Sequence, residues 1–225
     1  MKLNARLEKI DVPSYSHKQE IFNSVSHFLG VPLGLAIIIT AFSLFINKSL
    51  PISYFVGLLI FGTTIVLLYM VSGLYHICNP KRINEKKYKR IIDHCTIYAL
   101  IAGTYTPICL YIATNHILGY IILVIEWSFA IVGIILNYLD LTNKVIKIIS
   151  MVLYLLLGWM IIFTPGFLYI PFNSFIWVLI GGILYTIGAV TYGIGHKNLN
   201  FHGVFHVFTL LGTITQGIGV ILLFI

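Results

Sequence analysis

The hexapeptide FHGVFH, residues 201–206, opens the last apolar stretch of the chain and places two histidines four residues apart. On an α-helix, His202 and His206 would share one face and lie about 6 Å apart along the axis. Two imidazoles in this arrangement can bind one metal ion at about 2.0–2.1 Å, as on the HExxH helices of metalloproteases. The pair alone is a weak signal, so its meaning depends on which other residues reach the same depth.

A second pair with this spacing lies earlier in the chain, where Ser72 and His76 are also four residues apart. If His76 reaches the depth of His202 and His206, it supplies a third nitrogen. Three histidines and a water form an open zinc site of the catalytic type. Imidazole ligands suit zinc, and no cluster of thiolates is present to select copper or iron–sulfur. The predicted metal ligands are therefore His76, His202 and His206, and the predicted cofactor is zinc.

Asp93 and Ser72 are the predicted catalytic residues beside this metal. Asp93 could bind the ion directly, or it could hold a metal-bound water and act as the general base. Ser72 would lie one turn deeper than His76, where its hydroxyl could orient the water or a ligand. Two other interpretations stay open. Asp93 could simply cap a helix, and the histidines could respond to protonation instead of binding a metal.

These residues belong to a very apolar chain. Of 225 residues, 59% are hydrophobic and 9% are charged, and the mean hydropathy is +0.97. Soluble domains carry about 25% charged residues, so this composition excludes a water-soluble protein and indicates an all-α integral membrane protein. The cysteines are odd in number and form no CxxC pair, which argues against a disulfide framework. Cys78 and Cys95 could still reach the level of the histidines as thiolate ligands.

Apolar runs of about 20 residues are long enough to span a bilayer as helices. Seven such runs, separated by polar or proline-bearing breaks, predict a seven-helix bundle. The domain organisation that follows is a cytoplasmic N-terminal segment at 1–23 and a transmembrane domain at 24–225. The predicted helices lie near residues 24–46, 54–77, 91–112, 117–138, 148–168, 174–195 and 202–225.

The basic residues predict the orientation of these helices. Thirteen of the 14 lysines and arginines fall in the N-terminal segment and in the second, fourth and sixth connections, and only Lys48 falls on the opposite side. The positive-inside rule then places the N-terminus in the cytoplasm and the C-terminus outside. The net charge of +7 is thereby explained by topology and by contact with anionic lipid. We expect membrane lipids as partners and no nucleic acid; the pattern predicts no oligomeric state.

With this topology, four helices bring their unusual polar residues to one level near the cytoplasmic face. Polar residues inside a membrane are costly and are candidates for function. The residues that converge are Glu20, Asn23, His27, Ser72, His76, Asp93, His94, His202 and His206.

Glu126 is predicted to lie deeper than these residues, about 13 Å into the fourth helix and near the midplane of the membrane. A charged carboxylate is costly at that depth. Glu126 is therefore expected either to make a structural hydrogen bond to a neighbouring helix or to serve proton movement or substrate binding.

Taken together, these residues resemble the hemolysin III branch of the progestin and adipoQ receptor family, which forms a superfamily with the alkaline ceramidases. The resemblance runs from the first helix to the last. It is carried by Glu20-x-x-Asn23-x-x-x-His27, Ser72-Gly-Leu-Tyr-His76, Asp93-His94, Ile101-Ala-Gly-Thr-Tyr-Thr-Pro107, Gly158-Trp159 and Phe201-His202-Gly-Val-Phe-His206.

The resemblance implies a seven-helix bundle with its N-terminus inside the cell and zinc held by His76, His202 and His206. It also implies that Asp93 and Ser72 accompany the metal, commonly through its water. Relatives in the superfamily hydrolyse lipid amides, and the bacterial branch is described as hemolysin-like and as affecting membrane lipid composition. The expected location is a bacterial plasma membrane. Gln216 departs from the pattern, because many relatives carry a histidine near that position.

Three functions follow as hypotheses. The first is a zinc-dependent intramembrane hydrolase of a lipid amide or ester that serves membrane-lipid homeostasis. The second is a pore or cytolysin, for which Glu126 would be the deep polar residue. The third is a sensor in which zinc is structural.

Overall fold

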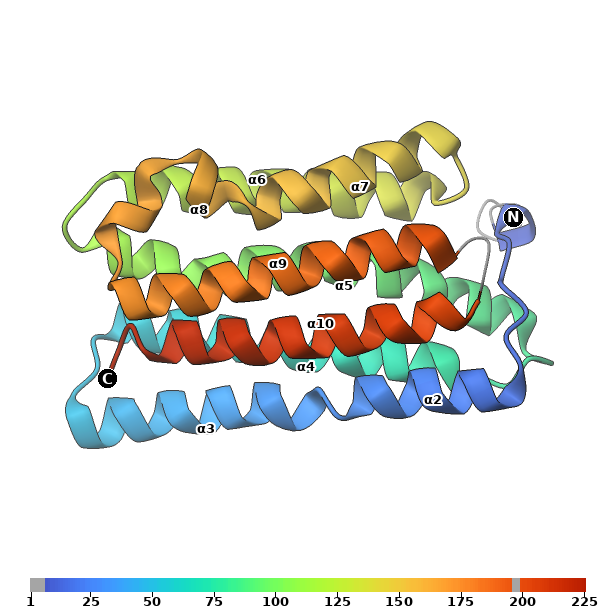
Figure 1. Ribbon diagram of the computed structural model, residues 1–225, viewed down its shortest axis with the longest axis horizontal. Coiled ribbons are helices and arrows are strands. Elements are labelled where there is room, and N and C mark those ends of the chain that lie inside the picture. Colours follow the sequence, from blue (N-terminus) through green and yellow to red (C-terminus); the bar gives the residue numbers. More distant parts are fainter. Residues whose placement is uncertain (1–6, 196–198) are drawn as a thin grey trace.

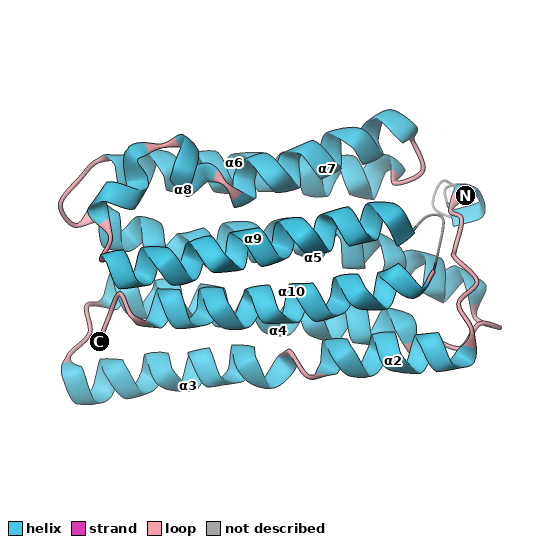
Figure 2. Cartoon of the chain, viewed as in Figure 1, coloured by secondary structure: helices cyan, strands magenta, loops and turns pink. Residues whose placement is uncertain are grey.

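The computed structural model describes residues 7–195 and 199–225, and all regular secondary structure within these ranges is helical (Figure 2). The helices lie along one long axis as a bundle (Figure 1), which confirms the predicted all-α class. The bounds are α2 His17–Phe28, α3 Val31–Lys48, α4 Ile52–His76, α5 Ile83–Ala113, α6 Leu118–Asp140, α7 Lys144–Gly158, α8 Met160–Phe163, the 3-10 helix η1 Pro165–Tyr169, α9 Phe172–Gly195 and α10 Asn200–Ile221.

Six helical segments of the described chain are long and apolar enough to cross a membrane. The segment at 148–168, predicted as one helix, is instead divided among α7, α8 and η1. These pieces run beside α6 along the edge of the bundle (Figure 1). The six candidate spans are His17–Lys48, Ile52–His76, Ile83–Ala113, Leu118–Asp140, Phe172–Gly195 and Asn200–Ile221.

The first span begins earlier than the predicted residue 24, because a capping box starts α2. The Ser16 hydroxyl accepts a hydrogen bond from the backbone N–H of Gln19, and the Gln19 side chain accepts one from the backbone N–H of Ser16. This reciprocal pair satisfies two backbone donors that a helix start leaves open. Helix α2 therefore carries Glu20 and the residues after it in regular positions, in line with α3 (Figure 1).

Close backbone contact joins α3 to α4. A Cβ atom at Gly34 would lie 2.6 Å from the carbonyl oxygen of Gly62, and a Cβ at Gly62 would lie 2.8 Å from the carbonyl oxygen of Gly34. Small residues let helices approach in lipid, where packing replaces hydrophobic association. The two glycines therefore fix how α4, which carries His76, sits against the first span.

The break between α7 and α8 is stabilised from α5. The Tyr105 hydroxyl donates a hydrogen bond to the carbonyl of Gly158 at 3.1 Å and accepts one from the N–H of Ile161 at 3.0 Å. Backbone groups freed by an interruption need such partners inside a membrane. The helix is thus interrupted without leaving these two groups unpaired.

The two ends of the bundle differ in charge, as predicted. The described N-terminal residues and the connections at 77–82 and 141–143 lie at one end, and the C-terminus lies at the other (Figure 1). Lys48, the exception in the charge count, ends α3 at the C-terminal side of the bundle. Lys2, Arg6 and Lys197, which that count includes, lie outside the described residues.

Candidate metal centre

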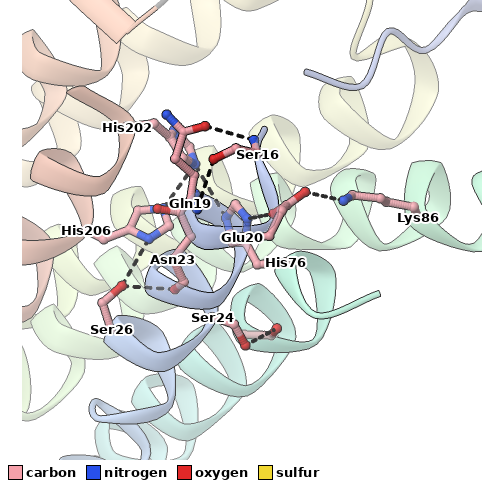
Figure 3. A network of polar contacts seen from close by, with 11 residues as sticks. Ser16, Gln19, Glu20, Asn23, Ser24, Ser26, His76, Lys86, His202 and His206 are labelled. Atoms are coloured by element: carbon pink, nitrogen blue, oxygen red, sulfur yellow. Dashed lines mark hydrogen bonds and ion pairs between the residues drawn. The ribbon is translucent and has the colours of Figure 1, made fainter. Parts of the chain in front are cut away.

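Three histidine side chains from α4 and α10 meet at the N-terminal end of the bundle (Figure 3). The Nε2 atoms of His202 and His206 are 3.0 Å apart, and those of His202 and His76 are 3.4 Å apart. One ligand atom from each histidine lies within 4.8 Å of the other two. The structure therefore brings together the three predicted metal ligands.

A carboxylate contacts Nδ1 of His76, the ring nitrogen opposite the one that faces the other histidines. Glu20 Oε2 lies 2.7 Å from Nδ1 of His76, and Glu20 Oε1 accepts a hydrogen bond from Nζ of the buried Lys86 (Figure 3). An ionised carboxylate is only an acceptor, so the proton of His76 resides on Nδ1. The Nε2 atom, which faces the other histidines, then carries a free lone pair.

His206 is supported in a similar way by Ser26. The Ser26 hydroxyl donates to the carbonyl of Asn23 at 2.9 Å, and its oxygen lies 3.3 Å from Nδ1 of His206. Because the hydroxyl proton is already engaged, the Ser26 oxygen acts as acceptor and the proton of His206 resides on Nδ1. The Nε2 of His206 thus also presents a lone pair.

This arrangement fits a bound cation. Nε2 of His202 can donate a hydrogen bond to only one of the other two Nε2 atoms. Without a cation, at least one of the two close N–N contacts would therefore have no hydrogen between its atoms. Two ligands bound to a tetrahedral ion at about 2.0–2.1 Å lie about 3.3 Å apart, close to the observed 3.0 and 3.4 Å separations. Metal-bound histidines commonly give their other N–H to a carboxylate or another acceptor, as Glu20 and Ser26 accept here.

Aromatic rings enclose the three histidines. The Tyr15 ring stacks on His202, with ring centroids 5.0 Å apart and an interplanar angle of 24°. The His27 ring lies edge-on to His206 at 4.0 Å, and both of its nitrogens are buried without a hydrogen-bond partner among the described residues. Burial raises the pKa of the Tyr15 hydroxyl above its usual value, so Tyr15 is neutral at physiological pH.

The predicted catalytic residues line a cavity of about 340 Å³ that His202 and His206 also line. Ser72 and Asp93 both face it, and the Ser72 hydroxyl lies within reach of the Asp93 carboxylate. Asp93 does not join the group of ligand atoms that lie within 4.8 Å of one another. The structure therefore places Asp93 and Ser72 beside the histidines rather than among them.

The cavity continues away from the histidines into the middle of the bundle. Along α10 it extends from Leu199 to Gln216, which corresponds to about 25 Å at 1.5 Å per residue. Its middle is walled by Gly158, Trp159 and Gly182 together with aliphatic and aromatic side chains of α5, α7 and α9. Long, mostly apolar cavities with a few polar groups at one place are typical of small-molecule sites.

Other residues considered from the sequence lie outside this group. Glu126 is fully buried, and neither of its oxygens has a hydrogen-bond partner among the described residues. The predicted structural hydrogen bond of Glu126 is therefore not found there. Cys78, Cys95 and Cys109 are free and buried, and none of them belongs to the histidine group.

Sequence reasoning placed Glu20 at the right level but missed its partners, and it missed Ser26, Lys86 and Tyr15 entirely. The spacing of Glu20, Asn23 and His27 on one face of a helix was the available signal for this side of the site. No pattern pointed to Tyr15, because it lies in an irregular segment before α2.

Comparisons with known proteins confirm the family resemblance seen in the sequence. A family model described as "Haemolysin-III related" matches residues 15–217. The chain is 34% identical over 201 residues to the protein named Hemolysin-3 homolog from Bacillus subtilis (strain 168), covering 88% of this chain and 91% of that protein. It is 35% identical over 198 residues to the protein named Hemolysin-3 from Bacillus cereus, covering 87% of each chain.

Proposed function

This chain belongs to the haemolysin-III-related family, and from that premise we propose that it is a zinc-dependent hydrolase of lipid amides or esters. It is a multi-pass bacterial membrane protein, and its proposed role is membrane-lipid homeostasis. One observation carries the proposal: three histidine Nε2 atoms converge beside a carboxylate and a hydroxyl at the end of a long apolar cavity.

His76, His202 and His206 would hold the zinc. A bound zinc ion lowers the pKa of water toward 7 and polarises a carbonyl group. Glu20 and Ser26 keep the ligand nitrogens free of protons by accepting from the opposite nitrogens. His202 and His206 also line the cavity, so a zinc ion held by the three histidines would be open to a water or substrate from that side.

Asp93 would act as general base through water rather than as a ligand. Its place in the cavity wall, outside the ligand group, supports this choice between the two predicted roles. The Asp93 carboxylate would take a proton from the attacking water and return it to the departing amine or alcohol. The Ser72 hydroxyl would orient Asp93, and hydrolysis would leave a carboxylic acid as the second product.

The shape of the cavity supports a lipid as the substrate class. Its reactive groups lie at one end, and the rest of its wall is mainly aliphatic and aromatic. A lipid would place its amide or ester bond at the histidines and its hydrocarbon chain along α5 and α10.

The proposed topology is seven crossings with the N-terminus inside and the C-terminus outside. Six candidate spans and the broken α7–α8 segment beside α6 support seven passes. The proposed orientation rests on the basic residues at the N-terminal end of the bundle. The histidines would then lie near the cytoplasmic face, in reach of lipids of the inner leaflet.

Elemental analysis of detergent-purified protein tests the metal site. We expect one zinc per chain in the wild type and little in His202→Ala, because one of three ligands is lost. Wild-type protein should also release fatty acid from a panel of lipid amides and esters, whereas Asp93→Asn should keep its zinc and lose turnover. Wild-type protein without metal would contradict the proposal.

Two outcomes would favour the other functions. Zinc binding without turnover on any lipid of the panel would favour a sensor with structural zinc. Currents in planar bilayers that Glu126→Gln abolishes would favour a pore, in keeping with the names of the two relatives.

A further inference from the structure

A segment at residues 7–16, helical at 7–9 and irregular from 10 to 16, crosses the N-terminal end of the bundle before α2 begins. We call it the N-terminal strap. Its first part is anchored by buried apolar side chains, with Leu7 5% and Ile10 6% exposed. These two residues form a separate small cluster with Ile91, Cys95 and Leu141 from α5 and the end of α6. The N-terminal strap is therefore packed as a structural element rather than left as a free tail.

Two basic side chains of α5 hold the backbone of the N-terminal strap. Arg90 donates a hydrogen bond to the carbonyl of Asp11, and Nζ of Lys87 donates to the carbonyl of Glu8 at 3.3 Å. Asp11, Pro13 and Tyr15 then form part of the cavity wall. The N-terminal strap thus closes the end of the cavity at which the histidines lie.

Tyr15 contacts the metal-binding group directly. Its ring stacks on His202 and lies edge-on to His76, with centroids 5.9 Å apart. Glu20 accepts a hydrogen bond from Nδ1 of His76, and Ser26 accepts one from Nδ1 of His206. The His202 ring is instead packed among the rings of Tyr15, Tyr192 and Phe205. Of these three rings, Tyr15 is the one that stacks on His202 and lies nearest to it, so it contributes most directly to the orientation of the His202 ring.

We propose that the N-terminal strap is a lid over the metal centre. Tyr15 is a positioning residue that orients His202 and slows the release of the metal into solvent. The proposal rests on the metal centre described above. It assigns a function to a segment that contains none of the ligands. Because Tyr15 acts through its ring rather than its hydroxyl, phenylalanine should replace it.

The test is the rate at which EDTA removes zinc from purified full-length protein. Tyr15→Ala should lose zinc about tenfold faster than the wild type, the size expected for loss of an aromatic contact. Tyr15→Phe should match the wild type because it keeps the stacked ring. Ser14→Ala, at an exposed position of the same segment, is the matched control and should also match the wild type.

A second variant shows whether faster zinc loss comes from loosening the N-terminal strap or only from disturbing the His202 ring. Ile10→Ser weakens the anchor without touching a ligand, and it should also accelerate zinc loss while the zinc content at saturation stays at one per chain. Equal rates for the wild type, Tyr15→Ala and Ile10→Ser would overturn the lid alone. Wild-type protein that binds no zinc would overturn the lid and the proposed metal centre together.

Discussion

At the histidine end of the cavity, the wall includes His202, His206 and the acid Asp93, whereas in its middle the polar atoms are bonded to one another. Trp159 Nε1 donates to the Thr186 hydroxyl at 3.0 Å, and that hydroxyl donates to the carbonyl of Gly182 at 2.8 Å. Tyr105 likewise satisfies the backbone at Gly158. The middle of the cavity therefore offers shape and apolar surface, and the histidine end offers chemistry.

The glycines also differ between regions, because some are needed for helix packing and others leave space in the cavity. At Gly34 and Gly62, a Cβ atom would collide with the backbone of the facing helix, so glycine is needed for packing. At Gly158, a Cβ would meet nothing within 4 Å, and at Gly182 it would make only ordinary contact with Trp159. Glycine at these two cavity positions leaves space that helix packing does not use.

The largest effect is expected at the histidine end, from Glu20→Gln. The amide cannot replace the charged acceptor behind His76, and it leaves Lys86 buried without a counter-charge. Loss of such a partner typically lowers metal affinity by about 10- to 100-fold. Competition with a fluorescent zinc chelator would measure the change.

The matched control for Glu20→Gln is Glu85→Gln. Glu85 also pairs with a lysine, Lys89, but that pair is at the surface of α5 and touches no histidine. Zinc affinity in Glu85→Gln should equal that of the wild type. Equal affinity in Glu20→Gln would show that Glu20 does not support the metal centre.

A smaller effect, confined to the middle of the cavity, is expected from Gly158→Leu. The added side chain would occupy space where we place the hydrocarbon chain. Each buried methylene is worth about 0.8 kcal/mol, so displacing two of them lowers affinity on the order of tenfold. Photolabelling with diazirine-bearing palmitate, mapped by mass spectrometry to peptides of α7 and α9, would detect the loss. Zinc content should not change.

Gly193→Leu is the control for that substitution. A Cβ at Gly193 also meets nothing within 4 Å, but Gly193 is exposed and does not line the cavity. Labelling of Gly193→Leu should match the wild type. If Gly158→Leu is labelled as strongly as Gly193→Leu, the middle of the cavity does not hold the chain.

Much of the fold could be predicted because an α-helix satisfies its backbone hydrogen bonds within one segment, as a chain that crosses lipid requires. Apolar runs therefore located α4, α6, α9 and α10 within a few residues. The start of α2 was placed too late, since five of the seven residues at 17–23 are polar and only the capping box at Ser16 and Gln19 marks the boundary. The division of α7 from α8 was also missed, because the interruption at Gly158 is not accompanied by any drop in hydrophobicity.

The three histidines could be predicted because depth in a membrane follows from position along each helix. Their supporting residues could not, because those depend on how each helix is rotated about its axis. Glu20 could face His76, lipid or another helix at the same depth, and the sequence pattern does not distinguish these cases. Tyr15 lies outside any periodic element, so only the folded path of the N-terminal strap shows its contact with His202.

The smallest effect is expected from Glu126→Gln, at a fully buried glutamate that differs from the half-buried Glu20 in its partners. Glu20 has two partners, whereas Glu126 is 0% exposed and its oxygens have none among the described residues. An ionised carboxylate without a partner is costly in such surroundings, so a neutral amide of similar shape should be tolerated. We expect zinc content to be unchanged and the free energy of unfolding to stay within about 1 kcal/mol of the wild type.

Zinc analysis, denaturation in detergent and lipid turnover of Glu126→Gln would measure this contrast. A variant that keeps its zinc and its stability but loses turnover would contradict the assignment of the chemistry to the histidine end, because a residue outside the cavity wall would then take part in the reaction. Unchanged turnover would instead confine the chemistry to the histidine end. Glu126 would then be a buried acid that the bundle tolerates, and Glu20 would be the glutamate on which the metal centre depends.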